Sequence, residues 1–530
     1  MRGWLREDIV SLLPPDFLSD PVSSVRTLEH EVIKESKLRW AALFTLPNRK
    51  KVFLKRDKTK DWIESLKFLA LPSRGSKEWL IAYRLQKGNL NIPKPLGWME
   101  KVRRGMVKES FYLSEAIGSG LSLMDLTHSG REFSFEGLVK AVRRVHDAGL
   151  FHMDFHGGNF LWDGESFYLT DLHRARILKS LSPHQRLWSL SHLFHSLRSS
   201  WGEETRKAFI ERYFGEEPPP LRKKEAYLRM IHRWMGRLQK RQWRSRTKRC
   251  LKESTEFAVW KGTEYTIYHR RDMNVDHVRK AVRDHLSVVK EKPSILVKSS
   301  PRTIVSILDV EGKRICVKHF LSPCLWDRFK DLFRASKGLK AWIAGNGLRA
   351  RGISSLLPIA VAEKKDLLST RESFFVMEAL KTGMEMDRYL SGGVVHFNRK
   401  RLFIRTFAQW LSDFHKTGLY HKDMKTCNLY VLENGETWDF RLLDLEDVLL
   451  EGKISVTRLF RNLLQLNTSA PERITRGDRL RFFKEYMKFN PLVKERKIFL
   501  NRLAQKSRER GLAYVSPCGV VEKPFLSSDR

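Results

Sequence analysis

Two segments of the chain carry the same chemically demanding residues at the same spacing. The first reads VHDAGLFHMDFHGGNFL and the second reads FHKTGLYHKDMKTCNLYV. Each is followed by a further aspartate, in YLTDLHRAR and in RLLDLEDV. Five residues recur 269 positions later, namely His146, Gly149, His152, Asp154 and Asn159 as His415, Gly418, His421, Asp423 and Asn428. Chance would not keep five such positions in register, so we interpret the chain as a tandem duplication of one unit.

The oxygen-bearing side chains of the repeat could bind a hard cation and phosphate. In the second copy, Asp423 and Asn428 fall on a loop after an expected helix, and Asp444 follows the run Phe440–Leu443. Carboxylate and amide oxygens, together with substrate phosphates, are the ligands that Mg²⁺ prefers. Lys318, on an expected upstream strand, could neutralise phosphate charge. Such positioning and charge stabilisation are what phosphoryl transfer requires.

The histidines beside these aspartates allow two other interpretations. We expect His152 and His421 to be structural, packing the loop and bonding to backbone, because the adjacent aspartates are better placed to act as bases. His152, Asp154 and His156 could also form an HxDxH metal cluster. The second copy has Lys425 where His156 stands in the first, which argues against a shared metal-hydrolase site.

The elements that must position these residues also occur twice. VFLK (52–55) matches ICVK (315–318), and FYLSEAI (111–117) matches FFVMEAL (374–380), each 263 positions later. A helical stretch containing a tryptophan lies between the two strands of each copy. Strand hairpins followed by helices predict an α+β fold class, with a small β-rich lobe and a larger helical lobe in each copy.

The length of 530 residues suits two domains of about 250 residues each. We expect the first over 1–220, ending at three prolines, then a basic amphipathic helical linker over 221–250, and the second domain over 251–530. Residues 221–252 carry 13 Lys or Arg and a single acid, with apolar residues at helical spacing. Their apolar stripe could pack on a domain, or the helix could dock on anionic lipid. The residues after about Cys518 are expected to form a loose tail.

The formal net charge of +38, from 99 Lys and Arg against 61 Asp and Glu, favours an anionic partner. Nucleic acid, an acidic membrane face and a phosphorylated substrate all fit that charge. No nucleic-acid reader motif is recognisable, so we expect no nucleic-acid partner. We expect neither a membrane-spanning helix nor a secretory signal. Five scattered cysteines predict reduced thiols in the cytoplasm rather than disulfides or a zinc site.

The loops around Asp154 and Asp423 resemble the catalytic loops of kinases. HKDMKTCN is similar to HRDLKxxN of protein kinases, with LLDLED at the position of DFG, and HMDFHGGN is closer to the HxDxHxxN form of aminoglycoside phosphotransferases. More specifically, both copies resemble the bacterial lipopolysaccharide kinases, which phosphorylate heptose or Kdo sugars of the inner core. That resemblance rests on DLHRARI (171–177), the stretch 461–487 beginning RNLLQLN, and CLKESTEF before the second copy. It implies two tandem protein-kinase-like domains that use ATP and Mg²⁺.

The resemblance also implies a role for each residue that matches the family's motifs. The catalytic bases that orient the acceptor hydroxyl would be Asp154 and Asp423, and the residues that reach the transferring phosphate would be His156 and Lys425. The metal ligands would be Asn159, Asp171, Asn428 and Asp444. Lys55 and Lys318 would contact the nucleotide phosphates, with Glu78 as the partner of Lys55. Adenine would be received by main-chain atoms near Glu115–Ile117 and Glu378–Leu380.

Two departures from the family's pattern concern the nucleotide site. Neither copy has GxGxxG before its lysine strand, where KESKLRW and VKSSPRTIV stand instead. A backbone hairpin without those glycines would have to cradle the phosphates. In the second copy Ala341 falls where Glu78 falls in the first, so Lys318 is expected to lack that partner or to take another.

The resemblance and the charge together predict a cytoplasmic enzyme that contacts the anionic inner face of the cytoplasmic membrane peripherally. It would transfer phosphate from ATP to a heptose or Kdo hydroxyl of the lipopolysaccharide core or another anionic acceptor. Two alternatives stay open. One is a kinase for a small molecule or a protein, and the other is a partly degenerate pair that binds nucleotide or glycolipid without catalysis.

Overall fold

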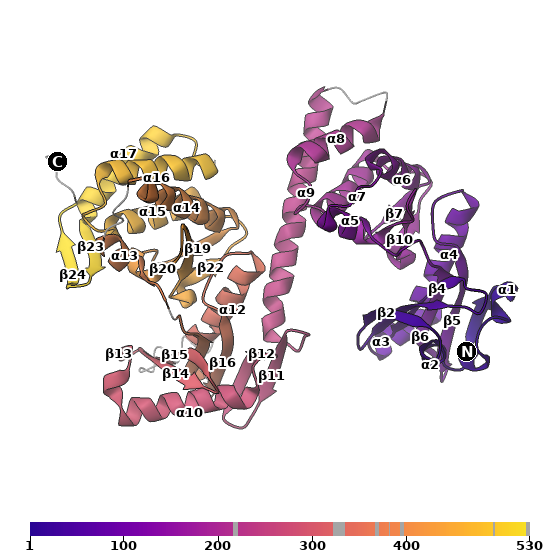
Figure 1. The fold of residues 1–530 in the computed structure, drawn as a ribbon, viewed down its shortest axis with the longest axis horizontal. Helices are drawn as coiled ribbons and strands as arrows, with labels where there is room; N and C mark the ends of the chain where they lie inside the picture. The colour runs from indigo at the N-terminus through magenta and orange to yellow at the C-terminus, as the bar shows by residue number, and fades with distance from the viewer. Residues whose placement is uncertain are drawn as a thin grey trace. The chain divides into compact units, whose positions relative to one another are not determined.

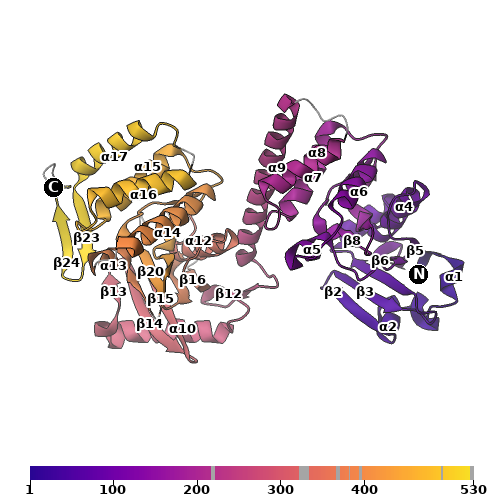
Figure 2. The same cartoon turned by 45° about the horizontal axis from the view of Figure 1, so that its top comes forward.

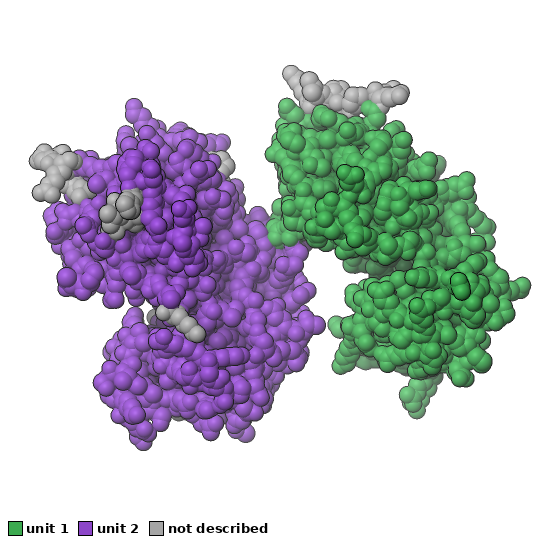
Figure 3. Space-filling model, in the orientation of Figure 1, with its two compact units in different colours: residues 1–239 green, residues 240–530 purple. Residues whose placement is uncertain are grey.

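The computed structural model divides the chain into two compact units, Met1–Gln239 and Lys240–Arg530 (Figures 1 and 3). It describes residues 1–215, 221–321, 334–365, 370–380, 382–392, 397–490 and 493–525. The three prolines expected to end the first domain lie outside these ranges. The division between the units falls within one helix, α9 (Leu221–Lys248), so the expected boundaries at 220 and 250 stay predictions.

Unit 1 begins with a six-stranded antiparallel sheet in the order β1-β5-β6-β4-β3-β2. Its strands are β1 (Arg2–Leu5), β2 (His30–Glu35), β3 (Arg39–Thr45), β4 (Lys51–Lys58), β5 (Pro95–Arg103) and β6 (Met106–Glu115). Successive residues of β6 face opposite sides of the sheet. Phe111 and Leu113 join a core with α2 (Pro21–Arg26), whereas Tyr112 packs with α4 (Arg74–Lys87). The sheet is therefore covered on both faces.

The rest of unit 1 is mainly helical. Its helices are α5 (Leu123–Ser129), α6 (Phe135–Asp147), α7 (Pro183–Ser196) and α8 (Glu203–Phe214). Between α6 and α7 lie four short strands, β7 (Leu150–His152), β8 (Phe160–Trp162), β9 (Phe167–Leu169) and β10 (Ala175–Ile177). Strand β7 pairs with β10 and β8 pairs with β9. These strands frame the segment that the sequence repeats.

Unit 2 has the same plan around a seven-stranded antiparallel sheet in the order β11-β12-β16-β17-β15-β14-β13. Its strands are β11 (Phe257–Lys261), β12 (Tyr265–Arg270), β13 (Lys298–Ser300), β14 (Thr303–Val310), β15 (Lys313–Leu321), β16 (Pro358–Lys365) and β17 (Thr370–Glu378). Helix α10 (Val275–Glu291) covers one face in both views (Figures 1 and 2), with Val278 and Val282 in the core. Helix α12 (Lys337–Ala350) packs on the other face through Trp342.

The helical part of unit 2 ends in a β-hairpin. Its helices are α13 (Met386–Gly392), α14 (Phe397–Lys416), α15 (Val456–Ser469), α16 (Arg476–Phe489) and α17 (Arg496–Arg510). Its short strands are β18 (Met384–Glu385), β19 (Leu419–His421), β20 (Leu429–Asn434), β21 (Thr437–Leu442) and β22 (Val448–Leu450). The hairpin pairs β23 (Leu512–Ser516) with β24 (Gly519–Lys523), and the Val515 N–H donates to buried Asp387 at 3.0 Å. The expected loose tail after Cys518 is therefore wrong as far as Lys523.

The strand that carries the lysine has the same neighbour and the same register in both units. Lys55 on β4 lies opposite Tyr112 on β6, and Lys318 on β15 lies opposite Phe375 on β17. The repeated strand pairs predicted from the sequence are therefore confirmed. The chain is a mixed α+β protein with two antiparallel sheets.

Among the five repeated residues, the glycine and the first histidine have structural roles. Gly149 and Gly418 follow α6 and α14 with φ values of +73° and +77°, and a Cβ there would collide with the carbonyl oxygen of Leu178 or Glu451. Only glycine fits such a left-handed, crowded position. The fully buried His146 and His415 bond through Nδ1 to tyrosine hydroxyls, those of Tyr213 at 2.8 Å and Tyr486 at 2.7 Å.

Helix α9 uses its apolar stripe for packing. Ile231 and Trp234 are buried in the helical core of unit 1, and Tyr227 and Met235 are partly buried against it. The interpretation of this stripe as a packing face is therefore confirmed, which leaves only the basic face of α9 for any anionic partner. No helix in the described ranges is both long enough and apolar enough to span a membrane.

Substituting Tyr486→Phe is expected to destabilise unit 2. The Tyr486 hydroxyl also accepts a bond from Asn490 Nδ2 at 2.7 Å, so the change removes a hydrogen bond from each of two buried side chains. The expected cost is about 1–3 kcal/mol of unfolding free energy, seen as a fall of several degrees in Tm by calorimetry. Tyr83→Phe, at an exposed tyrosine, is the control and should leave Tm unchanged. Equal melting of both variants would contradict a structural role for the His415–Tyr486 pair.

Candidate active site

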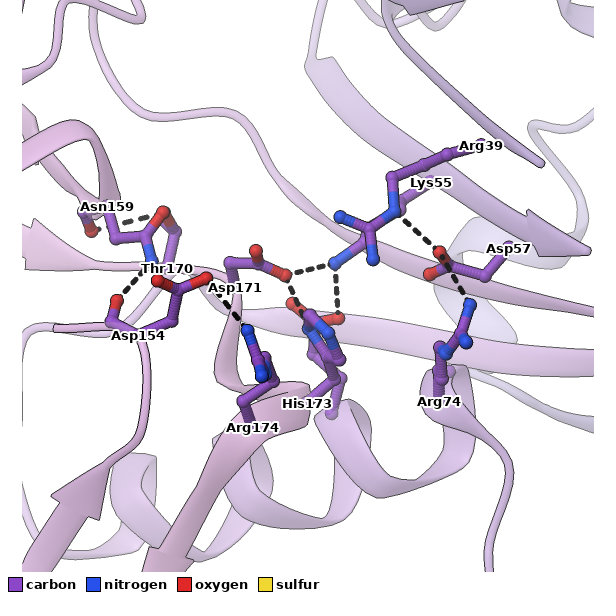
Figure 4. Close-up of polar contacts among 12 residues, drawn as sticks. Arg39, Lys55, Asp57, Arg74, Asp154, Asn159, Thr170, Asp171, His173 and Arg174 are labelled. Carbon is purple, nitrogen blue, oxygen red and sulfur yellow. Dashed lines mark hydrogen bonds and ion pairs between the residues drawn. The ribbon is translucent and has the colours of Figure 1, made fainter. Parts of the chain in front are cut away.

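A buried lysine joins three elements of unit 1. Lys55 on β4 is only 5% exposed, and its Nζ donates to Glu78 Oε2 of α4 at 3.0 Å and to Asp171 Oδ1, just after β9 (Figure 4). A buried ammonium group is costly unless it is paired and hydrogen-bonded, and here two carboxylates meet it. The structure therefore brings together three residues that the sequence separates widely.

The network holds Lys55 and Asp171 in their charged forms. Burial alone would raise the pKa of Asp171, but the bond from His173 Nδ1 at 2.6 Å and the charge of Lys55 hold that pKa below its usual range. Burial alone would lower the pKa of Lys55, but Glu78 and Asp171 raise it. Both contacts to Asp171 use Oδ1. Its backbone is left-handed, with φ of 59°, a conformation that aspartate tolerates better than most residues.

His152 organises the loop that carries Asp154. It is fully buried, and its Nδ1 accepts from the Asp154 N–H at 3.0 Å. Its Nε2 therefore carries the proton and donates to the Asp171 carbonyl oxygen at 3.1 Å. Burial lowers the pKa of His152 to about 4. The interpretation of this histidine as structural is confirmed, since it ties the two predicted acidic residues together through their backbones.

Asp154 and Asn159 belong to the same loop (Figure 4), where Asp154 is half-exposed and Asn159 is buried. Asn159 Nδ2 donates to the Asp154 carbonyl oxygen at 2.9 Å, which orients the Asn159 amide oxygen away from that contact. The Asp154 carboxylate is 38% exposed and lies 3.4 Å from Arg174 Nη1 and 3.9 Å from His156 Nε2. A half-exposed carboxylate beside Arg174 and His156 is accessible to an incoming hydroxyl.

In unit 2 the lysine takes a different second partner. Lys318 is 7% exposed and donates to Asp444 Oδ1 at 2.6 Å and to Glu446 Oε1 at 2.7 Å. Ala341, on α12, is fully buried and supplies no charge. Glu446 stands two residues after Asp444, where unit 1 has His173. Sequence reasoning missed Glu446. The signal was present, because LLDLED contains acids other than Asp444 and Lys318 was expected to lack a helix partner.

The loop around Asp423 has the same construction as its counterpart. His421 is fully buried, and its Nδ1 accepts from the Asp423 N–H at 3.1 Å. Its Nε2 donates to the Asp444 carbonyl oxygen at 3.0 Å. Asn428 Nδ2 donates to the Asp423 carbonyl oxygen at 2.8 Å. Lys425 Nζ lies 3.1 Å from Asp423 Oδ1, so it occupies the place that His156 has beside Asp154.

Helix α15 fixes this loop through side-chain amides. Asn462 Nδ2 donates to the His421 carbonyl oxygen at 2.6 Å, and Gln465 Nε2 donates to that of Lys422 at 2.7 Å. Gln465 Oε1 accepts from the Met424 N–H at 3.0 Å. These amides belong to the RNLLQLN stretch, whose role in holding the loop the sequence alone did not reveal.

Serine hydroxyls close the hairpins that replace the glycine-rich loop of the kinase pattern. Ser36 Oγ bonds to both the N–H of Arg39, at 3.1 Å, and its carbonyl oxygen, at 3.0 Å. Ser300 does the same with Thr303, at 3.1 and 3.0 Å. Each hairpin therefore holds a tight turn without the glycines of GxGxxG.

Glu115 and Glu378 end the two central strands β6 and β17. The N–H of Glu115 donates to the Lys94 carbonyl oxygen at 2.9 Å, and that of Glu378 donates to the Leu357 carbonyl oxygen at 3.0 Å. The Glu378 carboxylate accepts from Arg441 Nη1 at 2.6 Å. The chain therefore leaves the sheet at equivalent residues in the two units, Glu115 and Glu378.

The same constellation of lysine, paired acids and Asp–Asn loop thus occurs once in each unit. The model of the lipopolysaccharide kinase (Kdo/WaaP) family matches residues 23–213 and 335–486, one segment in each unit and more than half of the chain together. The chain belongs to this family. The two matched segments indicate two copies of the family's domain, so the protein is a member of a kinase family.

Individual relatives resemble one unit's length of the chain. The lipopolysaccharide core heptose(I) kinase WaaP of Escherichia coli (strain K12) is 28% identical over 226 residues, which are 38% of this chain and 84% of that protein. The 3-deoxy-D-manno-octulosonic acid kinase of Xanthomonas campestris pv. campestris (strain B100) is 30% identical over 137 residues, 26% of this chain and 54% of that protein. A solved structure of WaaP in complex with acyl carrier protein is 18% identical, with a TM-score of 0.33 over 40% of this chain and 87% of that one.

The low pKa of His152 predicts a loss of stability in mild acid. The unfolded chain takes up this proton near pH 6.5, whereas the folded protein takes it up only near a pKa of about 4. Between these values the unfolded state binds more protons, so the free energy of unfolding falls as pH decreases, by up to about 1.4 kcal/mol per pH unit for this group. His152→Gln should flatten that slope in urea denaturation at pH 7, 6 and 5. His232→Gln, at an exposed histidine, should leave it unchanged, and an unaltered slope for both would refute the assignment.

Proposed function

We propose that the protein is an ATP-dependent phosphotransferase that phosphorylates a heptose or Kdo hydroxyl of the lipopolysaccharide inner core. Each unit would be a protein-kinase-like domain, with its sheet as the small lobe and its helices as the large lobe. The observation that carries the proposal is the buried Lys55–Glu78–Asp171 network beside the Asp154 loop, together with membership of the lipopolysaccharide kinase family. Its repetition around Lys318 supports two working sites rather than one degenerate copy.

Asp154 would act as the base in the first unit, and Asp423 in the second. As the acceptor oxygen bonds to the γ-phosphorus, the carboxylate accepts the hydroxyl proton, and the bond from that phosphorus to the β-phosphate oxygen breaks to release ADP. The exposure of Asp154 permits contact with an acceptor. His156 and Lys425, beside these bases, would approach the transferring phosphate. Lys55 and Lys318 would contribute positive charge to the nucleotide phosphates.

The residues expected to bind Mg²⁺ have suitable chemistry for it. Asp171 and Asp444 have pKa values held low despite burial, largely by Lys55 with His173 in one case and by Lys318 in the other, so both offer ionised oxygens. Asn159 and Asn428 have their amide nitrogens engaged by the loop, which leaves their oxygens for a ligand. Asp171 with Asn159, and Asp444 with Asn428, would hold the metal. Mg²⁺ bound there would neutralise charge on the phosphates.

The nucleotide base would lie where each sheet meets its helical part. Backbone at Glu115–Ile117 and Glu378–Leu380 would receive adenine. The N–H groups of Glu115 and Ala116 already donate to Lys94 and Lys51, so Ile117 is the first of the three in unit 1 to offer its N–H to a base. The charge of +38 suits an anionic acceptor and contact with the anionic inner leaflet of the cytoplasmic membrane.

Transfer of labelled phosphate from ATP to underphosphorylated lipopolysaccharide tests the proposal. Asp154→Asn and Asp423→Asn should each remove part of the transfer, and the double variant should lose about 10²–10⁴-fold. Asp413→Asn, at an exposed aspartate of α14, is the matched control and should transfer like the parent. The absence of label with the parent chain, or undiminished label with the double variant, would exclude this function.

A second experiment tests the exchanged acid of unit 2. Glu446→Gln and Glu78→Gln each remove a charged partner of a buried lysine, which is worth about 1.5–3 kcal/mol. Each should weaken one of two classes of site for a fluorescent ATP analogue, by roughly tenfold or more. Asp447→Asn, next to Glu446 but 38% exposed, is the control. If Glu446→Gln left both classes intact, Glu446 would not be the functional equivalent of Glu78.

A further inference from the structure

Helix α3 (Trp62–Ala70) of unit 1 exposes large apolar side chains to solvent. Trp62, Ile63, Leu66 and Leu69 are 66%, 62%, 42% and 62% exposed. Their spacing places them on one side of the helix, and Ser65, at the edge of that side, is buried. A contiguous, solvent-exposed apolar face of this kind marks a site of interaction with a protein or a membrane.

The adjoining face of the same helix borders a cationic cavity of about 770 Å³. Glu64, Lys67 and Phe68 of α3 line it, and Asp154 lines it from the catalytic loop. The cations that line it are Arg39, Lys67, Arg74, Lys77, Arg174 and Arg176, against only two acids, Glu64 and Asp154. Figure 4 shows Arg174 beside Asp154, and Arg39 and Arg74 beside Asp57.

Several of these cations have no counter-ion of their own. Lys67, Lys77 and Arg176 form no ion pair with any residue that the structure describes. Burial first, and then the like charges of Arg176 and Lys67, lower the pKa of Lys77. The cavity therefore concentrates unneutralised positive charge, and anionic groups entering it would relieve that repulsion.

We propose, on the basis of the function proposed above, that α3 is a membrane-docking helix for an anionic bilayer. Its apolar face enters the outer part of the acyl region, and Lys67 with the cavity cations contacts the lipid phosphates. This contact brings the cavity, and Asp154 within it, to the headgroup layer in which a membrane-borne acceptor presents its sugars.

The combination of surfaces selects a bilayer over other occupants. Nucleic acid would satisfy the cations but leave Trp62, Ile63 and Leu69 in water. A neutral protein surface would cover the apolar face but leave the cavity cations without counter-ions. An anionic bilayer offers acyl chains to the apolar face and, directly above them, lipid phosphates to the cations, as an interfacial amphipathic helix requires. The basic helix α9, by contrast, has its apolar stripe packed inside the protein.

The test is co-sedimentation of the full chain with vesicles of equal parts phosphatidylcholine and phosphatidylglycerol. The variant Ile63→Ser with Leu69→Ser should bind these vesicles about tenfold or more weakly than the parent. The matched control makes the same two changes elsewhere in unit 1, as Ile33→Ser with Leu18→Ser, at side chains 54% and 52% exposed. It should bind like the parent, and melting curves should show both variants folded.

The charge of the cavity is tested separately. Lys67→Gln with Lys77→Gln should weaken binding to the mixed vesicles several-fold and make it less sensitive to salt. Equal binding of the parent to vesicles of phosphatidylcholine alone would overturn the anionic requirement. A parent that ignores both vesicles but forms a dimer broken by the α3 variant would identify a second copy as the occupant, and would overturn the proposal.

The vesicle assay contains neither nucleotide nor acceptor, so its result is independent of phosphoryl transfer. If the α3 variant binds vesicles like the parent, the docking helix is refuted, and transfer to lipopolysaccharide stands or falls by its own assay. If docking depends on α3 but no label reaches lipopolysaccharide, the proposed acceptor is refuted and the proposed docking helix stands. If both hold, the α3 variant should lose transfer to vesicle-embedded acceptor while retaining it towards acceptor dispersed in detergent.

Discussion

Each unit is organised around the need to neutralise one buried ammonium group. Lys55 and Lys318 lie on central strands, where water cannot solvate their charge, and each meets two carboxylates. Satisfying that requirement holds the middle of a strand, the loop after β9 or β21, and the histidine-bonded turn in one arrangement. Despite burial, the pKa values of Asp171 and Asp444 are in turn held below their usual range, by His173 and Lys55 in one unit and by Lys318 in the other. Sheet, loop and helical part are thus joined by electrostatics that only a precise approach of all three can satisfy.

The five residues that the repeat preserves divide into scaffold and chemistry. The glycines permit a left-handed turn against a carbonyl, the first histidines anchor helices through tyrosine hydroxyls, and the second histidines bond the backbones of both acidic residues. The aspartate and the asparagine are the two repeated residues whose side chains are proposed to contact a ligand. Identity of residues at fixed spacing therefore signalled a common backbone path as much as a common reaction.

Much of this arrangement could be predicted from the sequence because it depends on local patterns. The lysine strands, their neighbours 263 residues apart in the two copies and the structural role of His152 all follow from short motifs. Glu446, the serine-closed turns and the amides of α15 could not be predicted, because their partners are set by proximity in three dimensions. Strand β24, after Cys518, was missed for a similar reason, since it depends on pairing with β23, which in turn contacts α13. The proposed catalytic and metal-binding roles rest on the family resemblance and stay predictions.

Because Glu446 replaces Glu78, the buried lysine is paired with an α-helix in unit 1 but not, within the described ranges, in unit 2. In unit 1 the ion pair spans from the sheet to helix α4, so any displacement of that helix would pull a carboxylate away from a buried cation. In unit 2 both carboxylates come from the single turn at Asp444–Glu446, and α12 presents only the methyl group of Ala341. In the described part of the chain, Lys318 therefore forms no ion pair with α12, although α12 packs against the same turn through Leu445. Among the described residues, a shift of the helix would therefore separate an ion pair directly in unit 1, whereas in unit 2 it would reach the cluster only through apolar packing.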